Sequence, residues 1–232
     1  DGRLTAALCG PSYVVHGLDT DAGHVALARQ RLERLGVYGP VSVERFDGRR
    51  LPYAENLVNL VVAEDAAGVA HDEVMRVLAP GGTLYAREGG AWQKTVKPRP
   101  ANIDQWTHYA YDASNNPVAH DDVVGPPGRI QWTEGPRHTR SHEHLPGLCA
   151  LVSAGGRIFY IQDEAPTASL RFAPRWRLVA RDAFNGVLLW ERAIDTWYPH
   201  LAGWTQAPNQ LQRRLVAVGD RVRVLVDEEQ AS

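Results

Sequence analysis

Two aspartates stand where strands of a predicted α/β fold end. Asp19 follows the apolar pair Val14-Val15, and Asp47 follows residues 41–46, which alternate like a strand. In an open α/β sheet, ligands bind at the carboxyl ends of the strands, so each carboxylate is a candidate hydrogen-bond acceptor for a ligand. An isolated aspartate at such a place is also a common helix N-cap or turn residue, and this alternative stays open for both.

The elements that must position these aspartates alternate between strand and helix. The apolar pattern predicts strands at residues 41–46, 57–62 and 83–86, and helices at residues 25–35 and 74–78. The apolar stripe of the first helix consists of Val25, Leu27, Ala28, Leu32 and Leu35. The run at residues 57–62 is almost continuously apolar, as in a parallel strand covered on both faces. Strands separated by helices in this way predict a parallel α/β sheet.

Four motifs in this region have the order and spacing of a known family. They are residues 14–21, the helix at 25–35, residues 46–53, and residues 73–82 with their Pro-Gly-Gly ending. Together they resemble a class I S-adenosylmethionine-dependent methyltransferase. The resemblance implies a Rossmann-like α/β domain, present in part, over residues 1–88. It implies S-adenosylmethionine as the cofactor and cofactor contacts from Gly2, Asp19, Thr20, Asp47 and Gly48.

The resemblance also implies roles for individual side chains. Asp19 would accept hydrogen bonds from both ribose hydroxyls, and Asp47 would contact the adenine amino group. Pro52 and Tyr53 would help to close the adenine pocket.

Two departures from the family leave activity open. Asn59 stands where the family has an aspartate, and the sheet is expected to end after Leu84-Tyr85, without the further strands that shape an acceptor pocket. Methyl transfer depends on holding acceptor and sulfonium in line, so a domain without acceptor walls would bind cofactor without turnover. Glu64-Asp65 is a candidate general base with a solvated loop as its alternative, and no catalytic residue is assigned.

The pattern changes after a connector at residues 89–128. Residues 129–232 read as antiparallel strands joined by three short turns, at Gly155-Gly156, Asn185-Gly186 and Gly219-Asp220. The segment around the first turn is repeated around the third, so each repeat holds four strands. Four strands per repeat predict part of an all-β propeller.

Residues 180–190 resemble the repeat of pyrroloquinoline-quinone-type propellers, in which a turn leads into a strand bearing a docking tryptophan, here Trp190. Residues 128–132 resemble the outer strand of a preceding blade. Quinone-using dehydrogenases often carry a vicinal cysteine pair, which the lone Cys149 does not provide. We therefore expect no pyrroloquinoline quinone, and we interpret Trp190 as packing between blades.

A group of histidines offers one candidate metal site. His142 and His144 are two residues apart, so on a strand they would project to one face and could share a metal ion. A polar loop is the alternative, since no fixed ligand spacing supports the metal. His108 and His120 lie in a polar, aromatic stretch that suits either a ligand-facing loop or a docking surface.

Composition excludes several other classes. The 232 residues carry 25 Lys+Arg against 27 Asp+Glu, so there is no basic excess to bind nucleic acid. The two cysteines form neither a disulfide framework nor a four-thiolate zinc site. No apolar run reaches the roughly 18 residues of a membrane span.

Three functions follow from these patterns. The first is a methyltransferase-like cofactor domain fused to a propeller that holds an acceptor or protein partner. The second is a non-catalytic scaffold with a degenerate methyltransferase fold, and the third, the weakest, is a quinone-dependent dehydrogenase. The cofactor suggests a cytoplasmic protein, whereas such propellers are often exported. The resemblance also predicts that a first strand precedes Asp1 and that further blades follow Ser232.

Overall fold

The computed structural model describes residues 1–11, 13–64, 68–123, 125, 128, 130–135, 147–168, 172–195, 197 and 209–226. The chain divides into two compact units, Asp1–Arg99 and Pro100–Ser232. The first unit thus extends beyond residue 88, into the segment expected as a connector. None of the described helices is long and apolar enough to cross a membrane.

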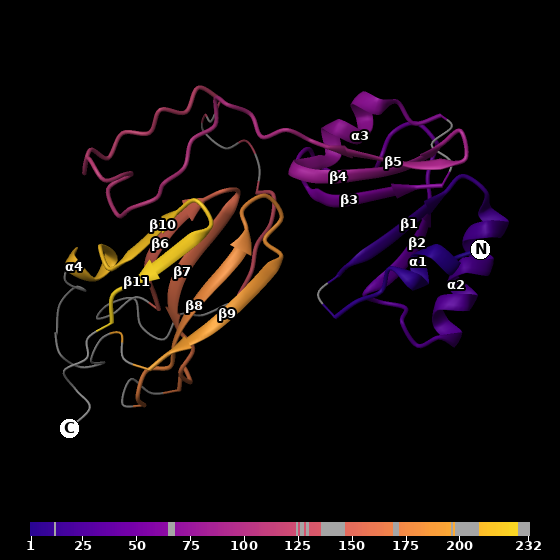
Figure 1. Cartoon of the computed structure of the whole chain (residues 1–232). Coiled ribbons are helices and arrows are strands. Elements are labelled where there is room, and N and C mark those ends of the chain that lie inside the picture. The colour runs from indigo at the N-terminus through magenta and orange to yellow at the C-terminus, as the bar shows by residue number, and fades with distance from the viewer. Residues whose placement is uncertain are drawn as a thin grey trace. The chain divides into compact units, whose positions relative to one another are not determined.

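The first unit alternates helices and strands, as the sequence predicts (Figure 1). Its elements are α1 (Arg3–Ala7), β1 (Val15–Asp19), α2 (Ala22–Arg34), β2 (Val41–Arg45), β3 (Val58–Ala63), α3 (His71–Val77), β4 (Leu78–Glu88) and β5 (Ala91–Val96). β1 pairs in parallel with β2, and β3 pairs in parallel with β4. The prediction of a parallel α/β domain is therefore confirmed.

The expected end of the sheet after Leu84-Tyr85 is wrong. β4 continues to Glu88, turns at Gly89-Gly90 and pairs antiparallel with β5. Both glycines have positive φ, 56° and 86°, a backbone region that glycine enters without steric cost. The turn therefore allows the chain to return along β4, where the sequence analysis expected a connector.

Each sheet of the first unit is packed against a helix. Asp21 caps α2 by accepting a hydrogen bond of 2.8 Å from the His24 amide, and the chain leaves the helix at Gly36 with a φ of 68°. From α2, Val25, Ala28 and Leu32 pack against Val41 and Val43 of β2. Leu27 and Leu35 of the predicted stripe are instead more than half exposed, so the buried stripe is narrower than expected.

The second sheet of this unit packs on α3. Val74 and Val77 of α3 form a core with Leu84 and Ala86 of β4. Leu60 of β3 is 46% exposed, so the prediction that this strand is covered on both faces is wrong for the described residues.

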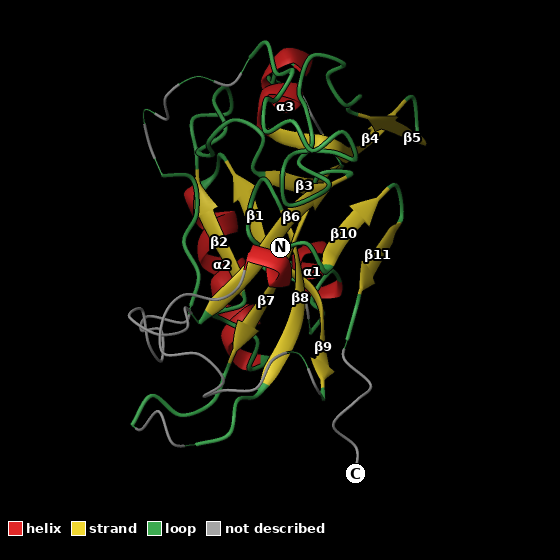
Figure 2. Cartoon of the chain, turned by 90° about the vertical axis from the view of Figure 1, so that its left-hand side faces the viewer, coloured by secondary structure: helices red, strands yellow, loops and turns green. Residues whose placement is uncertain are grey.

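The second unit contains the predicted antiparallel hairpins. Its elements are β6 (Leu148–Ala154), β7 (Arg157–Asp163), β8 (Trp176–Asp182), β9 (Leu188–Ile194), α4 (Asn209–Gln212), β10 (Leu215–Val218) and β11 (Arg221–Val224). β6, β7, β8 and β9 form one sheet in chain order, and β10 and β11 form a hairpin (Figure 2). All three turns occur where the sequence places them, with positive φ at Gly155, Gly156, Gly186 and Gly219.

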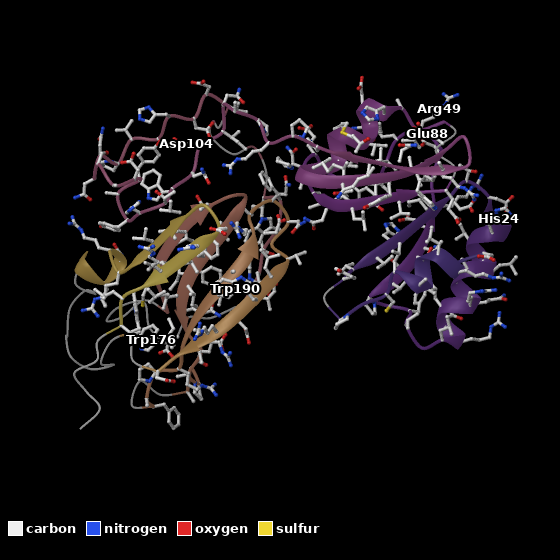
Figure 3. The ribbon with its side chains drawn as sticks, in the orientation of Figure 1. His24, Arg49, Glu88, Asp104, Trp176 and Trp190 are labelled. Carbon is white, nitrogen blue, oxygen red and sulfur yellow. The ribbon has the colours of Figure 1, made fainter. Side chains whose placement is uncertain are left out.

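The four-stranded sheet and the β10–β11 hairpin share one core. Val152, Phe159 and Ala180 of the sheet belong to the same buried cluster as Leu215 and Ala217 of β10. The described strands form no closed ring, so they show antiparallel sheets rather than a propeller. Trp190 lies on β9 (Figure 3), and its ring centroid is 6.0 Å from that of Phe159 on β7. Both residues belong to one sheet, so packing of Trp190 between blades stays a prediction.

Residues 130–135 do not form the strand that the resemblance suggested. They dock on the β8–β9 turn instead, where Trp132 Nε1 donates to the Ala183 carbonyl oxygen over 3.1 Å and Gln131 Nε2 donates to the Phe184 carbonyl oxygen over 3.0 Å.

A segment before the strands connects β6 to β10. The Trp106 amide donates to Ser153 Oγ over 2.9 Å, and the Ser153 amide donates to the Trp106 carbonyl oxygen over 2.6 Å. One residue on, the Thr107 carbonyl oxygen accepts from the Ala217 amide over 3.0 Å. Trp106 and Thr107 therefore join two strands that are distant in the sequence.

Candidate functional site

The carboxylates of Asp19 and Asp47 both lie at the carboxyl end of the β1–β2 sheet. Asp19 is the last residue of β1, and Asp47 follows β2 by two residues. Between them, the Phe46 amide donates to the Asp19 carbonyl oxygen over 3.1 Å and prolongs the strand pairing. The structure thus places both of these aspartates at the same end of one sheet.

Asp19 is held by the residues that begin α2. Its Oδ1 accepts a hydrogen bond of 2.9 Å from the Asp21 amide. Its Oδ2 lies 3.3 Å from Nδ1 of His24, which belongs to α2 (Figure 3). The side chain of Asp19 is 35% exposed. The carboxylate is therefore oriented by the protein and still accessible to a ligand.

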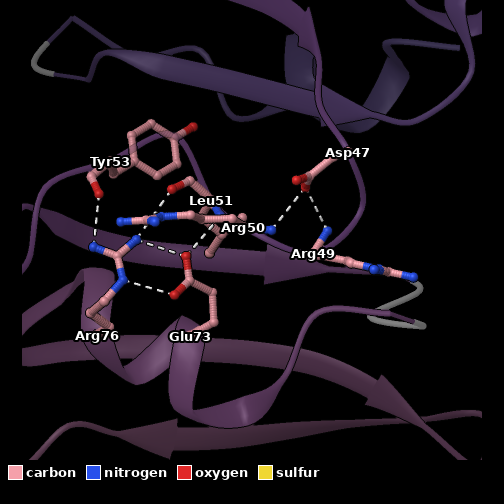
Figure 4. A network of polar contacts seen from close by, with 7 residues as sticks. All are labelled: Asp47, Arg49, Arg50, Leu51, Tyr53, Glu73 and Arg76. Carbon is pink, nitrogen blue, oxygen red and sulfur yellow. Dashed lines mark hydrogen bonds and ion pairs between the residues drawn. The ribbon is translucent and has the colours of Figure 1, made fainter.

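Asp47 is held by its own loop. Its Oδ1 accepts from the amides of Arg49 and Arg50 over 2.8 Å and 2.9 Å (Figure 4). These amides stabilise the anion and lower the pKa of Asp47 below its ordinary value. Within the described part of the chain, the hydrogen bonds to the Asp47 carboxylate reach Oδ1, and Oδ2 has neither a hydrogen bond nor an ion pair. Asp47 thus presents an ionised oxygen in a fixed direction.

Thr20 and Gly48 form the contact between the two loops. Gly48 has a φ of 77°, and a Cβ atom there would lie 2.9 Å from Thr20 Cγ2. The loop after β3 also reaches this place, because a Cβ atom at Gly68 would lie 2.9 Å from the Gly48 carbonyl oxygen. Three successive loops therefore meet beside the aspartates.

Gly2 lies against a helix. It precedes α1 with a φ of 76°, and a Cβ atom on it would lie 2.9 Å from Ala28 Cβ of α2. The contact with Ala28 explains why a glycine stands at this position. Among the described residues, Gly2 has no hydrogen bond or close contact with the other predicted cofactor residues, Asp19, Thr20, Asp47 and Gly48.

Tyr53 lies in a polar chain that the sequence analysis did not include. Its hydroxyl is 2.9 Å from His16 Nδ1 on β1, and His16 Nε2 is 3.5 Å from Glu44 Oε2 on β2. Burial, together with the charge of Glu44, raises the pKa of Tyr53 to about 12. Tyr53 is therefore a neutral hydrogen-bonding group near the loop of Asp47. His16 could not be found from its motif, because its role depends on pairing with another strand.

The candidate metal ligands His142 and His144 lie outside the described residues, as does Asp65. Across the described ranges, no group of three or more His, Cys, Asp or Glu side chains is arranged to hold a metal ion. His108 contacts Thr107 Oγ1 at 2.8 Å, and His120 packs edge-on against Tyr111 with ring centroids 5.5 Å apart. These two histidines have structural contacts within the second unit.

The first unit is similar in sequence to a known family of domains. Residues 1–82 match the family described as a methyltransferase domain. A ubiquinone/menaquinone biosynthesis C-methyltransferase of Pseudomonas savastanoi pv. phaseolicola is 36% identical over 92 residues, which cover 37% of this chain and 36% of that protein. The corresponding enzyme of Pseudomonas paraeruginosa is 34% identical over 92 residues, with the same coverage. The chain thus spans about a third of the length of these curated relatives.

Two solved structures are weakly similar. A putative S-adenosyl-L-methionine-dependent methyltransferase from Methanococcus maripaludis has 18% identity and a TM-score of 0.29, covering 32% of this chain and 36% of that one. The [4+2]-cyclase SpnF has 24% identity and a TM-score of 0.30, covering 34% and 33%.

Residues 1–82 thus resemble a methyltransferase domain, and the parallel pairing of β1 with β2 and of β3 with β4 is consistent with this match. The similarity to a methyltransferase domain and to C-methyltransferases implies S-adenosylmethionine as the cofactor.

Proposed function

We propose that the first unit binds S-adenosylmethionine at the carboxyl ends of β1 and β2, and that the whole protein transfers its methyl group to an acceptor. The observation that carries this proposal is the placement of two oriented carboxylates, Asp19 and Asp47, at one end of one parallel sheet. Two acceptors at such an edge suit a ligand with several donor groups, and a nucleoside offers hydroxyl and amino donors.

The residues present fit the adenosyl part of the cofactor. Asp19 accepts hydrogen bonds from the ribose hydroxyls, and Asp47 accepts one from the adenine amino group. Because Gly48 has no side chain, the loop after β2 can lie directly against Thr20. When bound, the cofactor supplies a methyl group on a sulfonium, which passes to a nucleophilic acceptor while S-adenosylhomocysteine is released and the acceptor loses a proton.

The acceptor side of the reaction depends on alignment. Glu64 and Asp65 are the candidates for a general base. Glu64 is exposed just after β3, and Asp65 lies outside the described residues, so we assign no general base. Orientation of the acceptor against the sulfonium supplies a large part of the barrier reduction in such reactions. We propose that the second unit holds the acceptor or a protein partner.

The repeat in the second unit supports a propeller-type arrangement for this role. β6–β7 and β10–β11 are two antiparallel hairpins with similar sequences that pack on one core. Propellers pack successive sheets in this way. A scaffold without turnover is the alternative function, and it shares this second unit.

A calorimetric titration of the full chain with S-adenosylmethionine tests the proposal. We expect binding by the wild-type chain and affinity at least about tenfold weaker in Asp19→Ala and in Asp47→Ala, since a hydrogen bond to a charged group contributes about 1.5–3 kcal/mol. Glu33→Ala removes an exposed carboxylate on α2 and serves as the matched control. Absence of binding, or equal affinity in all four proteins, overturns the proposal.

A further inference from the structure

Glu73 and Arg76 form a two-point ion pair one turn apart on α3. Arg76 Nη2 donates to Glu73 Oε1 and Arg76 Nε donates to Glu73 Oε2, each over 2.7 Å. The two side chains are 17% and 25% exposed. The planar guanidinium matches a carboxylate in this geometry, which fixes both side chains in one direction.

Both members of the pair also hold the loop that begins at Asp47. Glu73 Oε1 accepts from the Leu51 amide over 2.8 Å. Arg76 Nη1 donates to the Tyr53 carbonyl oxygen over 2.9 Å, and Arg76 Nη2 donates to the Leu51 carbonyl oxygen over 3.2 Å (Figure 4). The pair therefore fixes three backbone groups of the loop to α3.

The same loop supplies the amides that orient Asp47. Arg49 and Arg50, whose amides bond to Asp47 Oδ1, directly precede Leu51. Leu51 is anchored by its buried side chain as well as by the ion pair, and it is 8% exposed. A continuous run of contacts thus leads from α3 through Leu51 to the carboxylate of Asp47.

We propose that Glu73 and Arg76 are positioning residues for the cofactor, setting the backbone of residues 47–53 so that Asp47 meets the adenine. This inference rests on the proposed function. Neither side chain touches the cofactor in this role, because each acts through the backbone of Leu51 or Tyr53. Only a side chain with a planar fork reaches the carboxylate and two carbonyl oxygens at once, so Arg76→Lys keeps the charge and loses this combination.

The first experiment measures amide hydrogen exchange in the full chain without any ligand. In Arg76→Met and Arg76→Lys we expect the amides of Arg49, Arg50 and Leu51 to exchange at least about tenfold faster than in the wild type. Val25→Ala serves as the control, because it weakens the separate core between α2 and β2. Equal acceleration of these amides in Val25→Ala, or no acceleration in either Arg76 variant, overturns the proposal.

The second experiment asks whether Arg76 acts through Asp47. Titration with S-adenosylhomocysteine is expected to show about tenfold weaker binding in Arg76→Met than in the wild type, and little further loss when Arg76→Met is added to Asp47→Ala. If the losses of affinity in Arg76→Met and Asp47→Ala are additive, Arg76 does not act through Asp47. That result overturns the positioning role and leaves the proposed function intact. Failure of the wild-type chain to bind overturns the proposed function and, with it, the cofactor role of the pair.

Discussion

Gly48 lies so close to Thr20 that a Cβ atom at Gly48 would be 2.9 Å from Thr20 Cγ2. The loops after β1 and β2 are therefore in contact through a residue that has no side chain. Because Asp19 and Asp47 directly precede Thr20 and Gly48, this contact sets how the two carboxylates lie relative to each other.

Replacement of Gly48 tests the contact. Gly48→Ala is expected to destabilise the chain by about 1–2 kcal/mol through its left-handed backbone and by about 1–3 kcal/mol more through overpacking against Thr20. Urea unfolding measures the sum. Gly81→Ala is the matched control, since Gly81 has a φ of 83° with no atom within 4 Å of the Cβ position. Thr20→Ser, which removes Cγ2, is expected to restore part of the loss in Gly48→Ala; equal losses at Gly48 and Gly81 contradict the steric argument.

The ion pair on α3 predicts a pH dependence of stability. Hydrogen bonds from Arg76 and from the Leu51 amide lower the pKa of Glu73 from 4.5 to about 2. The pKa of Glu73 is lower in the folded than in the unfolded state. The ion pair therefore contributes its full stability at a pH above the unfolded pKa, and this stability is lost as the pH falls through the folded pKa of about 2. Near neutral pH, we expect the free energy of unfolding of the wild type to exceed that of Glu73→Gln by about 1 kcal/mol. This difference should disappear as the pH falls from about 5 to about 2. Urea unfolding at several pH values measures it; a gap that is constant over this range contradicts the prediction.

Lys97, the residue after β5, forms hydrogen bonds to three groups around α3 of the same unit. Its Nζ donates to Asn56 Oδ1 over 2.7 Å, to the Met75 carbonyl oxygen over 2.6 Å and to the Leu78 carbonyl oxygen over 2.7 Å. Lys97→Met removes the three hydrogen bonds from Nζ and is expected to lower the free energy of unfolding, measured in urea or by heating, by about 1–3 kcal/mol. Lys94→Met removes a cation contact between Lys94 Nζ, on the exposed strand β5, and the Tyr85 ring, and is expected to change stability far less. Similar losses in both variants contradict the role of Lys97.

The two thiols are expected to react differently. Cys9 is exposed, whereas Cys149 is buried in the core of the second unit and has its pKa raised to about 12, mainly by that burial. Since the thiolate is the reactive form, a thiol reagent at about pH 8 should modify one cysteine in the folded chain and two after denaturation. Mass spectrometry of the labelled peptides identifies the site. Rapid labelling of Cys149 in the folded chain would contradict the buried position.

The fold of the first unit could be predicted in large part because its strands and helices carry clear apolar periods. β5 was missed because all its residues are exposed, so no alternation of buried positions marks it. The hairpins of the second unit could be predicted from glycine-containing turns, which are local signals. How such hairpins assemble depends on contacts between distant segments, and a closed propeller remains a prediction.

The candidate site shows the same division. Asp19 and Asp47 could be found because a strand end is visible in the sequence. The part played by Glu73 and Arg76 could not, since their partners are backbone groups of Leu51 and Tyr53, and any residue type supplies those. The placement of Gly2 beside Ala28 likewise depends on helix packing and leaves no mark in the motif.

The hydrogen bonds between Trp106 and Ser153, and between Thr107 and Ala217, have a consequence for how the second unit folds. They join the segment before β6 to β6 and to β10, which is more than 100 residues later in the sequence, so they are contacts of high sequence separation. Chains with high contact order fold slowly, because the entropy of closing long loops is lost before the contacts form. During synthesis, the Trp106 segment and β6 therefore wait for β10 to leave the ribosome before this part of the core is complete.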